Sequence, residues 1–343
     1  MPSSSKNEGF VNKLLRRWFL DGLSAMAQGL FASLIIGLII SQISKIPGLS
    51  FLEQLTGVLA ASSPVVGSAI GVAIAYGLKS KPLTVFSSAA TGAIGYSLGG
   101  PVGAYIAAVV GVEIGALVAG KTKMDIVVTP LTVIVAGGLA GIFVGPGISQ
   151  FMTWIGAFIN AATELHKIPM GIIVSVVMGM ALTAPISSAA IAISLNLTGL
   201  AAGAATAGCC ANMIGFAVIS FKENGWGGLL SQGLGTSMLQ VPNIVKKPVI
   251  WVPVILASAI LGPISTTVAG MTNVAMGAGM GTSGLVGTIG TWTAMAGTQP
   301  AVLIWIKILV MQFIAPAALS LAFAGAMRKV GWIKTGDMKL KEI

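Results

Sequence analysis

The chain has 343 residues, of which 55% are hydrophobic and 8% are charged, and its mean hydropathy is +0.94. Soluble globular domains contain about 25% charged residues, so this composition excludes a soluble protein and indicates an integral membrane protein. The apolar runs are about 17 to 25 residues long and do not alternate in polarity. This pattern fits membrane-spanning helices, excludes barrel strands and predicts an all-α fold.

The basic balance of the chain does not indicate a nucleic-acid partner. The formal net charge is +10, but the 19 Lys and Arg residues form short clusters between apolar runs, where they fix membrane orientation. The only cysteines, Cys209 and Cys210, are adjacent within an apolar run, which excludes a disulfide framework and a CxxC site. His166 is the only histidine and lies at a predicted membrane edge. The sequence therefore supports neither a metal site nor a catalytic triad, and we expect no cofactor.

The first five spans follow from the N-terminus. Residues 1–21 are basic, and the apolar run at 22–43 is too long for the core of a secretory signal, so we expect it to remain as the first span. The uncharged run 83–112 is too long for one helix and is broken at Gly99-Gly100-Pro101, so it is predicted to form two helices. The other two spans are predicted at 55–78 and 126–144.

The segment 148–163 decides the topology of everything that follows it. Its 16 residues include Trp154, and they can lie flat at the outer interface or cross the membrane. In the first case Lys167 is external and two later repeat copies point in opposite directions. In the second case Lys167 is internal and the copies run parallel. We favour the crossing, because it places 17 of the 19 basic residues inside.

The rest of the chain predicts four more spans and two re-entrant segments. The spans are 168–186, 200–221, 248–266 and 300–327, and the re-entrant segments are 187–199 and 267–298. Apolar residues recur every fourth position from Trp226 to Met238, which predicts an amphipathic helix over 226–240 along the cytoplasmic surface. The sequence thus predicts ten spans in one membrane domain at 22–328, a basic tail at 329–343 and two cytoplasmic termini.

An internal repeat is the strongest pointer to a functional site. The motif Ala184-Pro-Ile-Ser-Ser188 returns 78 residues later as Gly262-Pro-Ile-Ser-Thr266, within repeat copies 167–208 and 247–284. Each motif follows an apolar run and precedes a polar, Gly-rich run with one asparagine, Asn196 or Asn273. We interpret the copies as two proline-broken helices whose polar tips meet to hold a ligand. The alternative is a pair of kinks that only aid helix packing.

Polar side chains of both copies and one acid form the predicted substrate site. Glu113 is the only acid well inside a span, where a charge costs about 2.5–3.5 kcal/mol. It can bind substrate hydroxyls, carry a proton or pair with Lys307. The candidate substrate-binding residues are Glu113, Thr183, Ser187, Ser188, Asn196, Asn212, Ser265, Thr266, Asn273, Thr282 and Ser283. No catalytic residue is predicted.

Five motifs resemble those of a known family. They are Lys123–Pro130, Thr183–Ser188, Asn212–Phe216, Phe221–Gly228 and Gly279–Gly284. Together they are similar to motifs of the IIC membrane components of the bacterial sugar phosphotransferase system. The most similar branch is the single-domain one that includes proteins labelled perfringolysin regulator, and the resemblance covers about residues 20–330.

This resemblance implies a ten-span, dimeric permease in the bacterial cytoplasmic membrane. Such a permease moves a sugar across the lipid bilayer by rigid-body motion, and a cytoplasmic IIB partner phosphorylates the sugar as it arrives. The chain resembles neither IIA nor IIB in any part, so these are expected as separate proteins.

One departure from the family pattern concerns the solute. Many sugar IIC proteins have a Glu directly before the Pro-Ile of the hairpin motif, where Ala184 and Gly262 stand here. In those proteins this Glu contacts hydroxyls of the sugar. Either Glu113 makes that contact here or the solute is not an ordinary sugar. Two other functions stay open: a proton-coupled secondary transporter that uses Glu113, and a membrane sensor that does not transport.

Overall fold

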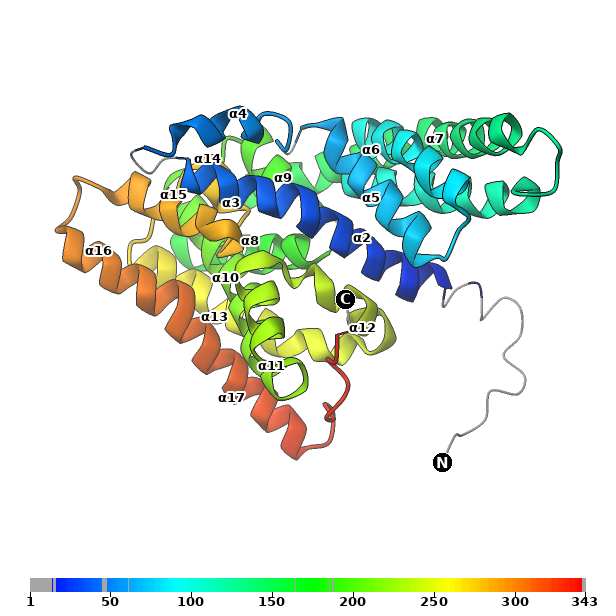
Figure 1. The fold of residues 1–343 in the computed structure, drawn as a ribbon. Coiled ribbons are helices and arrows are strands. Elements are labelled where there is room, and N and C mark those ends of the chain that lie inside the picture. The colour runs from blue at the N-terminus through cyan, green and yellow to red at the C-terminus, as the bar shows by residue number, and fades with distance from the viewer. Residues whose placement is uncertain are drawn as a thin grey trace.

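The computed structural model describes residues 14, 17–44, 48–60, 62–163, 165–184, 186 and 188–340. Within these ranges all regular elements are helices and no strand is present, which confirms the predicted all-α fold (Figure 1). Six of the described helical stretches are long and apolar enough to cross a membrane, and two shorter apolar helices accompany them. Most of the basic N-terminus, Lys45, Pro185, the candidate site residue Ser187 and the end of the tail lie outside the described residues.

The N-terminal half begins with one long helical course. Its parts are η1 (Arg17–Gly22), α2 (Leu23–Leu30), η2 (Phe31–Ile35) and α3 (Ile36–Ile43), and they are followed by η3 (Ser50–Leu52), α4 (Glu53–Thr56) and α5 (Pro64–Gly77). The predicted second span therefore starts later than expected, at Pro64. Ser63 fixes this start because its Oγ accepts a 3.3 Å hydrogen bond from the N–H of Val65, and Pro64 takes the first helical position.

The uncharged run that follows forms a helical hairpin, as predicted. α6 (Pro82–Val118) reverses at Gly99 and Gly100, directly before Pro101. Gly100 has φ +61° and ψ −151°, a conformation essentially restricted to glycine. The two arms touch: a Cβ placed on Gly95 would lie 2.7 Å from the Cβ of Ala107. In a straight helix these residues would be about 18 Å apart.

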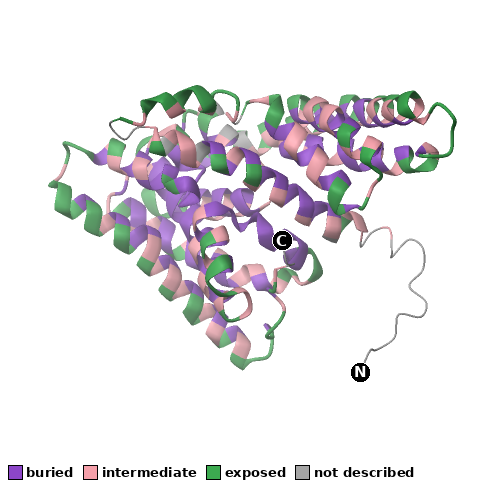
Figure 2. Cartoon of the chain, viewed as in Figure 1, coloured by how far each residue is buried: buried purple, intermediate pink, exposed green. Residues whose placement is uncertain are grey.

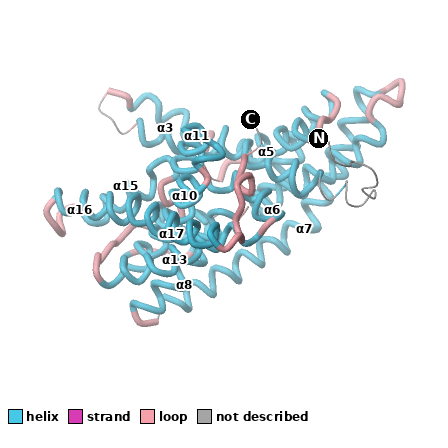
Figure 3. Tube along the Cα trace, turned by 90° about the horizontal axis from the view of Figure 1, so that it is seen from below, coloured by secondary structure: helices cyan, strands magenta, loops and turns pink. Residues whose placement is uncertain are grey.

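The next element, α7 (Asp125–Thr163), is one helix that continues through its two internal prolines. The expectation that 126–144 and 148–163 are separate spans with a turn between them is therefore wrong. The first part of α7 packs along α6, where Gly137 lies against Ala107. Its last part enters the core around α8 (Lys167–Thr183), where Ile159 is buried. Figure 3 shows α7 running from the N-terminal half toward α8. α7 thus connects the two halves of the molecule.

The C-terminal half contains both repeat copies and the segments between them. In chain order its elements are α8 (Lys167–Thr183), α9 (Ser188–Ser194), α10 (Gly199–Ile219), α11 (Phe221–Leu230), η4 (Ser231–Gly235), η5 (Ser237–Gln240), α12 (Val241–Lys246), η6 (Pro248–Trp251), α13 (Val252–Thr267), α14 (Ala275–Ala278), η7 (Ser283–Leu285), α15 (Val286–Met295), α16 (Ala301–Ile308), η8 (Leu309–Ile314) and α17 (Ala315–Lys329).

The first helices of the two copies, α8 and α13, pack in opposite directions. Thr266 Oγ1 donates to the carbonyl of Lys167 at 2.8 Å, and Ser175 Oγ donates to the carbonyl of Ser258 at 2.7 Å. Residue numbers therefore rise along α8 as they fall along α13. The favoured parallel arrangement of the copies is wrong, and the alternative in which they point in opposite directions is correct.

Each copy contains a hairpin that returns the chain. α10 runs parallel to α8, since Gly208 lies against Ser175 and Asn212 lies against Gly179, so residues 184–198 with α9 must bring the chain back. In the second copy, α14 and α15 fold on each other, and a Cβ on Gly287 would lie 2.2 Å from the carbonyl oxygen of Gly281. Both predicted chain reversals are present.

The segment predicted as a surface helix, 226–240, is placed differently. Only its start is exposed, with Trp226 73% and Leu230 55% accessible, and residues from Gln232 to Gln240 are buried or half-buried. The segment therefore enters the protein between the two halves, and the prediction of a helix lying along the surface is wrong. Its polar side chains, which a membrane surface would have solvated, take part in buried hydrogen bonds.

Four buried apolar clusters hold the structure together. One joins the N-terminal helical course, α5 and α6, and it also takes in Met238 and Leu239 from the C-terminal half. The other three surround α10, which is the most buried long helix, at 89%. In Figure 2 the buried residues gather where the N-terminal helical course meets the helices around α10, and exposed residues lie on the outer helices. The centre of the fold is therefore the junction between the halves.

Candidate functional site

A small cavity lies where the two halves meet the hairpins of both repeat copies. The N-terminal half contributes Leu30, Leu34, Ile35 and Pro101, and the C-terminal half contributes Leu182, Ile186, Ser188, Ala189, Thr236, Met238, Met280 and Ser283. Its volume is about 40 Å³. The N-terminal lining residues are all apolar, and the hydroxyl residues Ser188, Thr236 and Ser283 all come from the C-terminal half. No Asp, Glu, Lys, Arg or His is among the described residues that line it.

The tips of the two hairpins touch at this cavity. Ser188 Oγ, at the start of α9, donates to the carbonyl of Gly279 at 2.6 Å. Ser283 Oγ donates to the carbonyl of Gly235 at 2.8 Å, and the neighbouring Thr282 Oγ1 donates to the carbonyl of Gly233 at 2.5 Å. The first motif, through Ser188, therefore meets the second Gly-rich run at Gly279, and Thr282 and Ser283 join that run to η4.

Glycine is needed for this approach at two positions of the second tip. A Cβ on Gly279 would lie 2.4 Å from the carbonyl oxygen of Ser188, which is backbone and cannot move aside alone. Gly281 has φ +53° and packs against Cys209, so a side chain there would be strained and also overlap that residue. The run Gly279-Met-Gly281 thus lets the second tip contact the first tip and α10.

A buried hydrogen-bond network lies directly behind the cavity. Asn212 Oδ1 accepts from Thr183 Oγ1 at 3.1 Å and from Trp251 Nε1 at 3.0 Å. Thr183 Oγ1 is also 2.8 Å from Ser237 Oγ, and Asn212 Nδ2 donates to Ser258 Oγ at 3.2 Å. Thr183, Asn212, Ser237 and Ser258 are all fully buried. In a low-dielectric interior such a network fixes side-chain positions, because breaking one bond leaves a buried polar group unpaired.

Comparison with known protein families decides the identity of the chain. The family model described as "Phosphotransferase system, EIIC" matches residues 20–340. The chain belongs to this EIIC family. No curated protein and no solved structure matches it. This EIIC chain is a multi-pass membrane protein and the permease component of a sugar transport system, and separate IIA and IIB proteins act with it.

The structure of the EIIC chain divides the predicted site residues into groups. Thr183, Ser188, Asn212, Thr282 and Ser283 gather at the cavity or in the network behind it. Asn273 lies elsewhere, inside the second hairpin. Its Nδ2 donates to Thr206 Oγ1 at 2.7 Å, to the carbonyl of Gly287 at 2.9 Å and to Thr291 Oγ1 at 3.1 Å, and its Oδ1 accepts from the N–H of Val274. Its amide is fully used in joining the hairpin to α10.

Three other candidates of the EIIC chain lie away from the cavity. Asn196 is exposed and has φ +46°, so it forms the left-handed turn after α9. Ser265 and Thr266 lie beside the start of α8, because α13 is antiparallel to it. Ser265 Oγ is buried there without a hydrogen-bond partner. The symmetry of the two sequence motifs therefore does not bring Ser265 and Thr266 to Ser188.

Glu113 also lies outside the cavity of this EIIC chain. Its Oε1 is 3.1 Å from Arg17 Nε and accepts a 2.9 Å hydrogen bond from Trp18 Nε1, so it joins α6 to the N-terminal helix. The option of a pair with Lys307 is wrong, because Lys307 Nζ instead donates to the carbonyl of Ala269 and to Gln299 Oε1. Glu113 cannot replace the missing acidic contact in this arrangement.

Sequence reasoning missed Thr236, Ser237 and Trp251. The first two lie in the segment that was placed on the membrane surface, and Trp251 is in a short turn before α13. One signal could have found them: Gln232, Gln240 and Asn243 are uncharged amides, which suit a buried network better than a solvated face. Gln240 Nε2 donates to Gln232 Oε1 at 2.8 Å, and Asn243 Nδ2 donates to Gln240 Oε1 at 2.9 Å.

Proposed function

We propose that the sugar of this EIIC chain binds in the cavity between the N-terminal helical course and the two hairpin tips. The observation that carries the proposal is the set of three hydroxyl residues in an otherwise apolar lining, Ser188, Thr236 and Ser283, which both repeat copies and the buried segment supply. Each hydroxyl of the two tips caps a backbone carbonyl. A sugar hydroxyl can replace either partner, so binding exchanges hydrogen bonds without leaving a polar group unpaired.

The size of the cavity indicates that the two halves separate during transport. Its volume of about 40 Å³ is close to the ~30 Å³ that one water molecule occupies, and a sugar ring needs several times more. Among the described residues, the N-terminal half meets the cavity only with Leu30, Leu34, Ile35 and Pro101. Because that wall is apolar, parting the halves there breaks no hydrogen bond across the cavity. We infer that the C-terminal half moves against the N-terminal half and carries the polar wall with it.

The described residues that line this site include no carboxylate, in agreement with the alanine and glycine of the two hairpin motifs. The sugar would be held by hydroxyls and by the carbonyls of Gly233, Gly235 and Gly279, which suits an uncharged ligand. The pairing of Glu113 with Arg17 gives the proton-coupled alternative no support. We therefore retain sugar permeation with IIA and IIB as the working function.

Uptake measurements on cells that produce the full chain test this assignment. Ser188→Ala and Ser283→Ala should each lower uptake of the transported sugar about fivefold or more, because each removes a hydroxyl worth roughly 1 kcal/mol or more at the site. A panel of labelled hexoses and hexitols identifies the transported sugar first. Wild-type uptake by both variants at equal membrane levels would overturn the assignment.

Crosslinking tests the proposed movement. Leu34 belongs to the N-terminal half and Ala189 to the first tip, and both line the cavity. A Leu34→Cys, Ala189→Cys pair joined by a short bifunctional thiol reagent should stop uptake, and each single variant treated in the same way should continue to transport. Unchanged uptake after complete crosslinking would contradict separation of the halves.

We also propose that both termini are cytoplasmic and that Lys167 is external. The support is the clustering of cations: Arg17 contacts the loop at Leu78, and Lys81 contacts Ala119, so these basic positions lie at one end of the N-terminal half. With α8 and α13 antiparallel, Lys167 and Lys247 lie at opposite ends of the C-terminal half. Labelling of Lys167→Cys by an impermeant maleimide on intact cells tests the orientation, and protection of this cysteine would contradict it.

A homodimer in the lipid bilayer is the remaining part of the proposal. α7 carries a row of exposed apolar side chains that includes Leu131, Leu139 and Phe143, the last 80% accessible. Such a face needs lipid or a second copy against it. Native mass spectrometry of the detergent-solubilised chain should show a dimer, and Phe143→Arg should weaken it. A monomer at all concentrations would exclude the dimer.

A further inference from the structure

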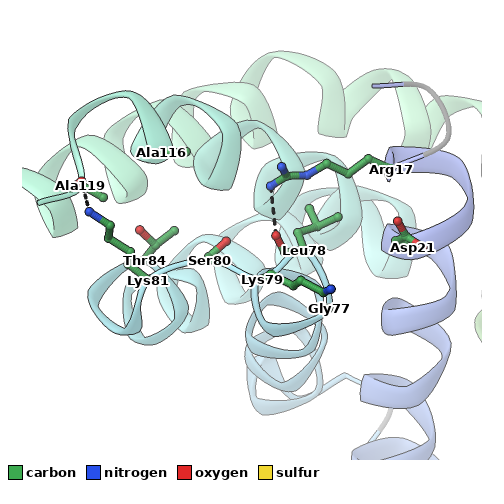
Figure 4. A pocket seen from close by; sticks show the side chains of 10 residues that line it. All are labelled: Arg17, Asp21, Gly77, Leu78, Lys79, Ser80, Lys81, Thr84, Ala116 and Ala119. Carbon is green, nitrogen blue, oxygen red and sulfur yellow. Dashed lines mark hydrogen bonds between the residues drawn. The ribbon is translucent and has the colours of Figure 1, made fainter. Parts of the chain in front are cut away.

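A second pocket lies in the N-terminal half, away from the hairpin tips. It has a volume of about 460 Å³ and lies between the start of the N-terminal helix, the loop from α5 to α6 and the end of α6. Three cations line it: Arg17, Lys79 and Lys81. Figure 4 shows the hydroxyls of Ser80 and Thr84 between the head groups of Lys81 and Arg17.

The cations are fixed by hydrogen bonds that leave donors available. Arg17 NH2 donates to the carbonyl of Leu78 at 3.1 Å, and Lys81 Nζ donates to the carbonyl of Ala119 at 2.8 Å. An ammonium group has three donors, so Lys81 retains two. Asp21 also lines the pocket, and Glu113 pairs with Arg17, so these two carboxylates oppose part of the positive charge. Lys79 is exposed at the rim, with φ +56°.

The start of α6 adds to this arrangement. α6 begins at Pro82, so the N–H groups of Leu83 and Thr84 have no partner within the helix, and the helix dipole favours an anion there. An independent observation points to a ligand: Thr84 is 1% exposed, and its Oγ1 has no hydrogen-bond partner within the described part of the chain. Ser80 Oγ, beside it, is also buried without a partner. Two unpaired hydroxyls and three cations together supply the hydrogen-bond donors and the positive charge that bind a tetrahedral oxyanion.

We propose that this pocket binds a phosphate group, carried either by an anionic lipid headgroup or by a soluble phosphate ester. Thr84 Oγ1 and Ser80 Oγ donate to its oxygens, Lys81 and Lys79 balance its charge, and Arg17 closes the side formed by the N-terminal helix. The site connects that helix to α5 and α6 at the end where the basic loops lie. It is separate from the sugar cavity, so it would attach the N-terminal half to its phosphate ligand without touching the transported sugar.

Binding measurements on the purified full chain test the proposal with two probes. Native mass spectrometry counts retained phosphatidylglycerol, with phosphatidylcholine as the reference lipid, and isothermal titration calorimetry measures inorganic phosphate. Thr84→Val should lower the affinity for the probe that binds about fivefold or more, and Lys79→Gln should lower it about tenfold. Lys123→Gln, at an exposed lysine outside the pocket, is the matched control and should change neither.

The pattern of results separates the two sources. Selective retention of phosphatidylglycerol that both variants weaken assigns a lipid headgroup, and binding of inorganic phosphate that both variants weaken assigns a soluble ester. The proposal is overturned if neither probe binds, or if Thr84→Val and Lys79→Gln bind both probes as well as Lys123→Gln does. Thr84→Val also has a stability readout, because valine removes an unpaired hydroxyl and should leave the unliganded chain at least as stable.

Discussion

The two repeat copies share a motif but use it in different ways. In the first copy α8 ends at Thr183, and the residues after it turn into the tip that lines the cavity. In the second copy α13 continues through Pro263 to Thr267, so the prediction that this proline breaks the helix is wrong. The serine after it, Ser265, is buried against the start of α8, far along the helix from the first motif.

The reason for the difference lies in the antiparallel packing of α8 on α13. A Cβ on Gly262 would lie 2.0 Å from the carbonyl oxygen of Gly171, so the residue before Pro263 is where the two backbones cross. Ala184, the matching residue of the first copy, is extended and half-buried at a helix end. The comparison teaches that one copy of the motif leads into a tip that lines the cavity, whereas the other copy is a packing surface.

The largest loss of stability should come from disrupting the close contact between the backbones of α8 and α13 at Gly262. Gly262→Ala places a methyl group inside the backbone of Gly171, and overpacking of this kind costs about 1–3 kcal/mol or more. We expect a clear loss of thermal stability in detergent, with reduced yield of folded protein. Gly325→Ala is the control, since a Cβ there meets no atom within 4 Å. Equal melting temperatures for the two variants would contradict the close contact between Gly262 and Gly171.

The second prediction compares the two matched asparagines. Asn273→Ala removes donors from Thr206, Thr291 and the carbonyl of Gly287, so we expect a loss of about 1–3 kcal/mol in stability. Asn196→Gly should leave stability and uptake unchanged, because glycine accepts the left-handed turn that Asn196 forms. Thermal unfolding of both variants and an uptake assay check the pair. A larger loss of stability in Asn196→Gly than in Asn273→Ala would show that Asn196, and not Asn273, is the asparagine that stabilises the fold.

The sequence was sufficient for features that depend on local chemistry. Gly99-Gly100-Pro101 predicted the α6 hairpin because φ at Gly100 and the proline ring decide the backbone there. The Gly279–Gly284 run predicted a close-packed second tip for a similar reason. Thr183, Ser188 and Asn212 do have hydrogen-bond partners, as hydroxyls and amides in apolar helices need, and their predicted role in substrate binding stays a prediction.

The relative directions of the helices depend on long-range packing, which local chemistry does not reveal. Segment 148–163 has the composition of either an interfacial or a spanning helix, and only its continuation from α7 shows that no turn precedes it. Charge counting then favoured the parallel arrangement, because one lysine, Lys167, was enough to tip the count. The burial of 232–240 was missed for a related reason: its apolar spacing fits a membrane surface as well as a protein interior.

The third prediction tests the different uses of the two serines. Ser265 Oγ is buried and unpaired, so Ser265→Ala should leave uptake unchanged and keep or slightly raise the melting temperature. Ser188→Ala should lower uptake, since its hydroxyl lines the cavity and donates to Gly279. Each variant loses one hydroxyl from a copy of the motif, in which Ser188 matches Thr266 and Ser265 matches Ser187. Loss of uptake in Ser265→Ala with normal uptake in Ser188→Ala would place the sugar on the second motif instead.

The smallest predicted effect concerns the lysines that begin the two copies. Lys167 is joined to the second copy through its carbonyl, which accepts from Thr266, and Lys247 is joined to the tail by a 2.5 Å contact between its Nζ and Asp337 Oδ2. Burial raises the pKa of Asp337, but hydrogen bonds from Lys247 and from the N–H of Lys334, with the charges of both lysines, outweigh it and lower the pKa below its ordinary value.

Because the folded pKa of Asp337 is the lower one, its stabilising contribution is complete above the unfolded pKa of about 3.9 and is lost as the pH falls through the folded value. The pair is partly exposed, so Asp337→Asn should cost less than about 1 kcal/mol at neutral pH. The difference from wild type should vanish in acid. Lys247→Gln should remove only part of this pH dependence, because the N–H of Lys334 still donates to Asp337, and the double variant should lose less than the sum of the two single variants. Additive losses in the double variant would show that Asp337 and Lys247 act independently, and the tail would then not hold the start of the second copy.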